Sequence, residues 1–272
     1  GSVVTGTDAT SVRSQVNANA DAGANFIKVR VDDNLGRTAK MSTELIDVLI
    51  AEAHQRRLPV AVHLFYLDDA KYILEAGADL IAHSIRDAAV DGELLNLIQT
   101  NDVCYISTLT REVSAFIYED EPAFFADPFF LKEADENVLN QLRSPERQSR
   151  IRSSASAQAY KAGLEVAMAN LSMLSNEGVR IAMGTDSGPP ARFQGYFSHM
   201  EMQMMVDAGM SPLDVIRSAT AVAADCINAN DVGTLEPGKW GDLIVLEMSP
   251  LTDIANTKTI EGVWLAGNRV SD

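Results

Sequence analysis

Short apolar runs alternate with amphipathic stretches along most of the chain. A short, continuous apolar run predicts a buried strand, and apolar residues at helical spacing, such as Leu45, Val48 and Leu49, predict a helix. The predicted strands cover residues 26–31, 59–65, 80–85, 103–107 and 179–184. The predicted helices cover residues 10–22, 43–57, 68–76, 91–99, 152–177, 198–208 and 211–226. This alternation predicts an α/β fold with a buried parallel sheet covered by helices.

Two segments depart from this pattern. Residues 112–150 hold five phenylalanines among acidic residues and prolines, and we expect a long excursion over a pocket, either a lid or an oligomer contact. From about residue 231, glycines and a proline separate short predicted strands at 242–247 and 260–266. We therefore expect one α/β domain over residues 1–230 and a C-terminal β segment over residues 231–272.

Charge and composition narrow the classes of partner. The 272 residues include 38 acidic and 22 basic side chains, a formal net charge of −16. This acidic balance argues against binding to nucleic acid, which requires a basic face, and against binding to an anionic membrane surface. No apolar run approaches the roughly 20 residues that a membrane span requires. We expect a cytoplasmic protein that acts on a small molecule.

The two cysteines are far apart in the sequence. Cys104 lies in an apolar run and Cys226 in a helical pattern, and together they form no CxxC motif. This spacing gives no support to a disulfide framework, so we expect two buried free thiols.

Four polar residues lie in or at the ends of predicted strands. His63, His83 and Asp186 each end an apolar strand, and Lys28 lies inside one, where burial of a lone ammonium is costly. Chemistry in parallel α/β folds takes place at the carboxyl ends of the strands. Two neutral imidazoles suit Zn²⁺ or a similar divalent ion, and a carboxylate beside them can accept a proton from water. A lysine that reacts with CO₂ becomes a carbamate, an oxygen ligand that can bridge two metals.

Other interpretations of these residues stay open. Each histidine could be a satisfied core residue, and Lys28 could form a Schiff base, although the histidine pair would then have no role. His54 lies on a polar helix face, where we expect it to be solvated. Four further side chains are weaker candidates for substrate contact, since a salt bridge or core packing would also explain them: Arg30, Tyr105, Arg111 and His199.

In order and spacing, Lys28, His63, His83 and Asp186 in its Gly-Thr-Asp turn resemble the amidohydrolase superfamily of metal-dependent hydrolases. Residues 233–246, from Gly-Thr-Leu-Glu-Pro-Gly onward, are similar to the closing segment of that superfamily. The helix pair with Asp-Ala-Gly-Met-Ser-Pro at residues 207–212 resembles its imidazolonepropionase and Xaa-Pro dipeptidase-like branch.

This resemblance implies a (β/α) TIM barrel with an accessory β-sandwich. It implies one or two divalent metal ions, most simply zinc, with Lys28 as a bridging carbamate and His63 and His83 on the more exposed ion. Asp186 would touch the buried ion and act as general base in cleavage of a C–N bond in an amide, peptide-like or cyclic amide substrate.

The sequence also departs from the superfamily pattern, because no histidine precedes His54 and the His-x-His pair of the first barrel strand is absent. We therefore expect only about five of the eight barrel strands, with the N-terminal part missing. The alternative is a non-catalytic fragment that needs a separate N-terminal chain or self-association, as in a homo-oligomer, to complete the barrel.

Overall fold

A computed structural model describes residues 6–270. Its contacts divide the chain into two compact units, which are described separately below. The first unit comprises the described residues up to Ile106 together with Met173–Ile181, and the second comprises Ser107–Ser172 and the described residues from Ala182 onward. None of these division points coincides with the domain boundary expected at residue 231, and that boundary stays a prediction.

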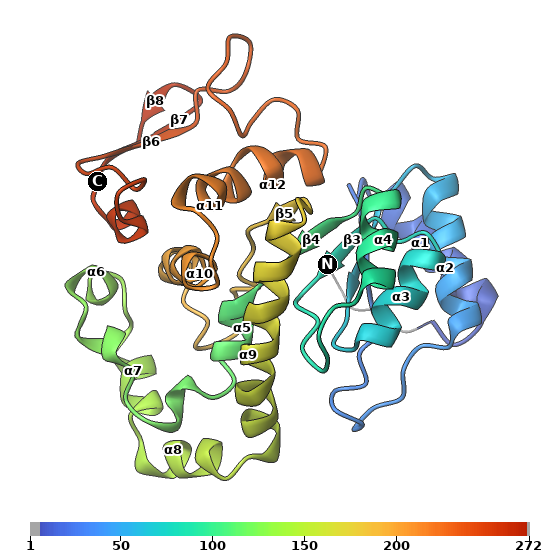
Figure 1. Cartoon of the computed structure of the whole chain (residues 1–272), viewed down its shortest axis with the longest axis horizontal. Helices are drawn as coiled ribbons and strands as arrows, with labels where there is room; N and C mark the ends of the chain where they lie inside the picture. The colour runs from blue at the N-terminus through green and yellow to red at the C-terminus, as the bar shows by residue number, and fades with distance from the viewer. Residues whose placement is uncertain (1–5, 271–272) are drawn as a thin grey trace. The chain divides into compact units, whose positions relative to one another are not determined.

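The first unit is built around a sheet with the order β1-β2-β3-β4-β5, in which the pairs β1–β2, β2–β3 and β3–β4 are parallel. The strands are β1 (Ile27–Arg30), β2 (Val60–His63), β3 (Leu80–Ala82), β4 (Cys104–Ile106) and β5 (Ile181–Ala182). The helices that precede or connect the first four strands are α1 (Ala9–Asp21), α2 (Thr43–Gln55), α3 (Leu67–Glu75) and α4 (Gly92–Thr100), of which α1 packs on α2 and α3 on α4 (Figure 1). The predicted α/β fold with five strands is confirmed.

Local sequence explains where these elements begin. Asp8 caps α1, and its side chain and that of Ser11 form a reciprocal capping box. Asp91 caps α4 by accepting a hydrogen bond from the N–H of Leu94. Every residue of β2 and β3 is buried, as a parallel strand covered on both faces requires.

The second unit is mostly helical. Its elements are α5 (Leu109–Val113), η1 (Ile117–Glu119), η2 (Ala123–Ala126), α6 (Pro128–Leu131), α7 (Glu136–Leu142), α8 (Pro145–Arg152), α10 (Tyr196–Asp207), α11 (Pro212–Ala219) and α12 (Ala221–Cys226), and the long α9 (Ala155–Asn176) begins in it. The single helix expected over 211–226 is wrong, because the chain leaves helical geometry at Thr220.

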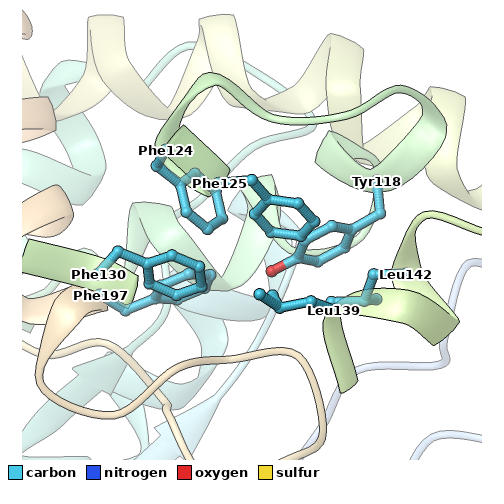
Figure 2. Close-up of a cluster of buried hydrophobic side chains, with 7 residues drawn as sticks. All are labelled: Tyr118, Phe124, Phe125, Phe130, Leu139, Leu142 and Phe197. Atoms are coloured by element: carbon cyan, nitrogen blue, oxygen red, sulfur yellow. The ribbon is translucent and has the colours of Figure 1, made fainter. Parts of the chain in front are cut away.

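The excursion over residues 112–150 forms short helices around an aromatic core of its own. Figure 2 shows these rings gathered together. The rings of Phe124 and Phe130 meet edge to face, with their centroids 4.9 Å apart. The seven buried members of this aromatic cluster are Tyr118, Phe124, Phe125, Phe130, Leu139, Leu142 and Phe197. The excursion is therefore a packed substructure that also includes residues of α10.

The C-terminal segment forms a small antiparallel sheet with the order β6-β7-β8. Its strands are β6 (Leu243–Leu246), β7 (Ile260–Leu265) and β8 (Asn268–Arg269), and the 3₁₀ turn η3 (Ile254–Lys258) precedes β7. Ala266 and Gly267 both have positive φ, which makes the tight turn between β7 and β8. The β-rich C-terminal segment is thereby confirmed.

The expectation for the cysteines is wrong in one respect. Cys104 and Cys226 are buried, as expected, but neither is a free thiol, since both are disulfide-bonded. Distance along the sequence places no limit on pairing in a folded chain, so the wide spacing could not exclude a disulfide. Among the described residues, no helix is long and apolar enough to cross a membrane.

Candidate active site

The two strand-end histidines of the first unit lie against each other. His63 is the last residue of β2, and His83 directly follows β3 with a φ of 79°. Their rings meet edge to face with centroids 4.3 Å apart. His63 is 8% exposed and His83 only 1%, so both imidazoles are nearly removed from solvent. The predicted histidine pair at the carboxyl ends of adjacent strands therefore has the proximity that two ligands of one cation require.

Asp32 is a partner of His63 that the sequence reasoning missed. It lies two residues beyond β1, and its buried carboxylate Oδ2 is 2.9 Å from Nε2 of His63 and 3.5 Å from Nη2 of Arg30. The backbone N–H of Asn34 also donates to it. Because an ionised carboxylate only accepts, Nε2 of His63 carries the proton in this pair. A carboxylate after a buried strand end is the same signal that identified both histidines, and it could have identified Asp32.

The environment of Asp32 keeps it ionised. Burial by itself would raise the pKa of Asp32, but the hydrogen bonds from His63 and the Asn34 N–H, with the charges of His63 and Arg30, bring that pKa well below its ordinary value. A permanently charged carboxylate fixes the tautomer and orientation of the His63 ring.

The expected burial of Lys28 is wrong. Residues of β1 alternate between buried and exposed, and Lys28 and Arg30 both lie on the exposed side. The strand is at the end of the described sheet order, so an ammonium there avoids the cost of burial. Lys28 pairs with Ala61 and Arg30 with His63, and alternation therefore places Lys28 on the face that also carries His63. Lys28 and His63 lie on adjacent strands and are offset by two residues, so their Cα atoms are about 8 Å apart.

The donor set of the first unit fits a divalent cation through two imidazoles and Lys28. Two histidine nitrogens and one anionic oxygen are the usual three protein ligands of a catalytic zinc site. Within residues 6–270, no group of three or more His, Cys, Asp or Glu side chains is arranged to hold a metal. A carboxylated Lys28 as the third ligand stays a prediction from the resemblance.

Asp186 belongs to the second unit and pairs with a residue that the sequence reasoning did not consider. Nη1 of Arg192 lies 2.6 Å from Oδ2 of Asp186 and 3.1 Å from its backbone carbonyl. Nε of Arg192 donates to Oγ of Ser114 at 3.1 Å. The residues between Asp186 and Arg192 are rich in glycine and proline. Nothing in that composition indicates that the arginine side chain contacts Asp186.

The weaker candidates for substrate contact lie in different surroundings. The hydroxyl of Tyr105 accepts the N–H of Ile85 inside the first unit. Arg111 is buried, stacks over the Tyr160 ring at 4.8 Å and pairs with Glu112 at 3.0 Å. Burial would lower the pKa of Arg111, but the charge of Glu112 outweighs it and the pKa is raised. Both side chains thus have structural partners, and their role in substrate binding stays a prediction.

His199 lies against the C-terminal segment. Its Nδ1 is 2.9 Å from Oγ1 of Thr257, and its ring meets that of Phe129 edge to face at 5.0 Å. Burial, and then the positive charge of Lys258, lower the pKa of His199. The neutral form is therefore favoured, and contact with substrate stays a prediction for this residue too.

Comparison with known proteins decides the family. The model of the amidohydrolase family matches residues 3–270, nearly the whole chain. The chain belongs to the amidohydrolase family. The resemblance to this family is therefore confirmed, and members of this family generally bind divalent metal ions.

The relatives include the branch that the sequence indicated. The imidazolonepropionase of Streptomyces griseus is 30% identical over 100 residues, which is 36% of this chain and 26% of that protein. Among solved structures, a Xaa-Pro dipeptidase with bound methionine matches 99% of this chain and 60% of its own, with a TM-score of 0.73 and 23% identity. Ochratoxinase from A. niger matches 97% and 55%, with a TM-score of 0.70 and 23% identity.

The chain covers only part of the length of each of these relatives. The chain spans about a quarter of the curated imidazolonepropionase that it matches and about three fifths of the solved amidohydrolases. At such identities the solved structures show the fold, and they agree with the parallel sheet and small antiparallel sheet described above.

Proposed function

We propose that this amidohydrolase is a metal-dependent hydrolase that breaks a C–N bond in a small amide, peptide-like or cyclic amide substrate. The observation that carries the proposal is the buried His63–His83 pair with its Asp32 partner at the strand ends of the first unit. Two buried imidazoles, one of them oriented by a carboxylate, are a usual ligand pattern for a catalytic divalent ion.

In this proposal His63, His83 and a carboxylated Lys28 hold the ion, most simply zinc, with one ion or two. A divalent cation bound there would supply Lewis acidity that makes a water molecule more acidic and a better nucleophile. Asp32 accepts a hydrogen bond from the Nε2–H of His63 and so leaves Nδ1 as the proposed donor to the cation. The low pKa of Asp32 keeps this orientation constant across the neutral range.

Asp186 is the proposed general base. It accepts one proton from the attacking water as the new C–O bond forms, and it delivers that proton to the leaving nitrogen as the C–N bond breaks. The products are a carboxylic acid and an amine, and no oxidant or further reactant is consumed.

The named relatives suggest where to look for a substrate. One relative is an imidazolonepropionase and another is a Xaa-Pro dipeptidase with methionine in its active site. We propose that Arg30, on the same face as Lys28, contributes to substrate binding, since its exposed guanidinium can donate hydrogen bonds to a substrate carboxylate. Tyr105, Arg111 and His199 are kept as weaker proposals, in view of their structural partners.

Two properties of the whole protein are also proposals. A homo-oligomer is one, tested by the mass measured with light scattering. A cytoplasmic location is the other, although disulfide-bonded cysteines are commoner in oxidising compartments and count against it.

The first test combines metal content with hydrolysis. The purified chain, supplied with Zn²⁺ and bicarbonate, is incubated with L-methionyl-L-proline, N-acetyl-L-methionine and imidazolonepropionate, and the products are measured by chromatography. We expect turnover of at least one compound, abolished by a chelator and by His63→Asn or His83→Asn. Asp186→Asn should lower kcat by about 10²–10⁴-fold.

His54→Asn is the matched control, because the His54 side chain is exposed and forms its hydrogen bond with Asp79 on the surface of the first unit. Absence of turnover of all three compounds, or turnover that both histidine variants retain, would contradict the proposed function.

A further inference from the structure

We propose that Arg192 is a positioning residue that fixes the Asp186 carboxylate. Its place in the reaction rests on the proposed function, in which Asp186 moves the proton, whereas its effect on the position of Asp186 follows from the contacts of the second unit alone. Asp186 has a φ of 51°, a left-handed conformation that is uncommon outside glycine. Such a conformation persists where the surrounding structure holds it, and the contacts of the Asp186 carboxylate and carbonyl with Arg192 do so here.

Three hydrogen bonds connect the Arg192 guanidinium to its surroundings. Nη1 contacts both the carboxylate oxygen Oδ2 and the carbonyl oxygen of Asp186, at 2.6 and 3.1 Å. Nε contacts Oγ of Ser114 at 3.1 Å, and that hydroxyl donates to the carbonyl of Arg111 at 2.6 Å. The planar guanidinium therefore joins Asp186 to the C-terminal end of α5, and a rotation of the carboxylate would break one bond while the others held the arginine in place.

The backbone around Arg192 is itself anchored in the aromatic cluster. Its neighbour Ala191 accepts a hydrogen bond from the Tyr118 hydroxyl at 2.6 Å. Its other neighbour, Phe193, meets the Phe130 ring edge to face at a centroid distance of 4.8 Å. The Arg192 N–H donates to the Pro189 carbonyl at 3.1 Å, which closes a turn immediately before it. The aromatic excursion thus supplies a rigid base for the arginine, a role distinct from that of a lid.

The solvent exposure of the Asp186–Arg192 ion pair indicates that the pair orients the carboxylate and does not serve mainly to stabilise the fold. The side chain of Asp186 is 33% exposed and that of Arg192 is 20% exposed. Ion pairs that solvent reaches contribute little to folding stability. Loss of this pair should therefore leave the fold intact and change mainly the orientation of the carboxylate.

The first arm of the test is structural and needs no turnover. Crystal structures of the wild-type chain, Arg192→Met and Arg192→Lys are compared at Asp186. We expect the carboxylate to leave its wild-type position by more than 1 Å in Arg192→Met, and to keep it in Arg192→Lys, where an ammonium can still reach Oδ2. An unchanged Asp186 carboxylate in Arg192→Met would overturn the proposal.

The second arm is kinetic and uses whichever of L-methionyl-L-proline, N-acetyl-L-methionine and imidazolonepropionate the wild-type chain hydrolyses. A misplacement of about 1 Å costs about 10²-fold in rate, so we expect kcat of Arg192→Met to fall about 10²-fold with KM nearly unchanged. Arg192→Lys should recover part of the loss, because lysine can contact Asp186 but cannot also reach Ser114 in the same plane. Guanidinium ion added at millimolar concentration should raise kcat of Arg192→Ala.

Arg150→Met is the matched control, since Arg150 is exposed on α8, and its kcat should equal that of the wild type. The proposal is overturned if Arg192→Met keeps wild-type kcat, or if KM alone changes. A wild-type chain that hydrolyses none of the three compounds counts against the proposed function, and the crystal structures still decide whether Arg192 positions Asp186.

Discussion

The buried carboxylate of Glu201 should be a major contributor to the stability of the second unit. Glu201, on α10, is fully buried and receives four hydrogen bonds at the start of α5. Oε1 accepts from Ser107 Oγ at 2.9 Å and from the Leu109 N–H at 2.7 Å. Oε2 accepts from the N–H and the hydroxyl of Thr110, both at 2.7 Å. We predict that Glu201→Gln, which keeps the shape, destabilises the protein strongly.

The magnitude follows from counting donors. Whichever oxygen becomes the amide NH₂, the hydroxyl opposite it, on Ser107 or Thr110, can turn to accept. The backbone N–H of Leu109 or Thr110 cannot, so one buried N–H is left facing another donor, at a cost of about 1–3 kcal/mol. Burial raises the pKa of Glu201 and the hydrogen bonds from Thr110, Leu109 and Ser107 oppose that shift; in the ionised form each bond is stronger than a bond to a neutral oxygen by about 1 kcal/mol. We therefore expect a loss of about 3 kcal/mol in the free energy of unfolding.

Urea denaturation at pH 7, followed by circular dichroism, measures this loss. For a chain of this size, about 3 kcal/mol corresponds to a decrease of about 6–12 °C in Tm. Glu165→Gln is the control, because Glu165 is exposed on α9, and it should change the free energy of unfolding by less than about 0.5 kcal/mol. If Glu201→Gln behaves like the control, the four-bond account of Glu201 is refuted.

Three further predictions concern other parts of the chain. Burial and the charge of a neighbouring lysine hold the pKa of His199 below its ordinary value, so its contribution to stability is present above about pH 6.5 and is lost as the pH falls below it. Urea titrations from pH 8 to 5.5 should show a shallower loss of unfolding free energy in His199→Asn than in the wild type. Equal dependence of the unfolding free energy on pH in the two proteins would contradict this prediction. Phe124→Ala removes a ring packed against several others (Figure 2) and should cost about 3–5 kcal/mol in urea denaturation, whereas the same change at the exposed Phe26 should cost far less; similar losses would contradict the packing. In denaturant, Cys104 and Cys226 should react with a thiol reagent only after reduction, and reaction before reduction would exclude the disulfide-bonded state.

The sequence predicted those parts of the fold that depend on local patterns. Continuous apolar runs predicted β2 and β3, and helical spacing predicted α2 and α9 to within a few residues at each end. The short helices of the excursion escaped prediction, because they are held by rings from residues 118 to 197 that meet only in the folded chain. The break at Thr220 and the state of the cysteines depend on the folded structure in the same way.

Those parts of the site were predictable in which a single residue is recognisable from its position at the end of a strand. A histidine at the end of a buried strand is visible in sequence, and the contact between the His63 and His83 rings agrees with it. The exposure of Lys28 was not visible, because an isolated strand pattern does not reveal that β1 ends the described sheet. Asp32 and Arg192 become partners of His63 and Asp186 through turns whose paths the sequence does not specify.

The most direct test of the metal-dependent account is a calorimetric titration of the metal-free wild-type chain and His63→Asn with Zn²⁺ in bicarbonate buffer. The account predicts at least one tight site in the wild type that is lost or greatly weakened in His63→Asn, since His63 is a proposed ligand held in place by Asp32. Equal binding by the two proteins, or no binding by the wild type, would contradict it.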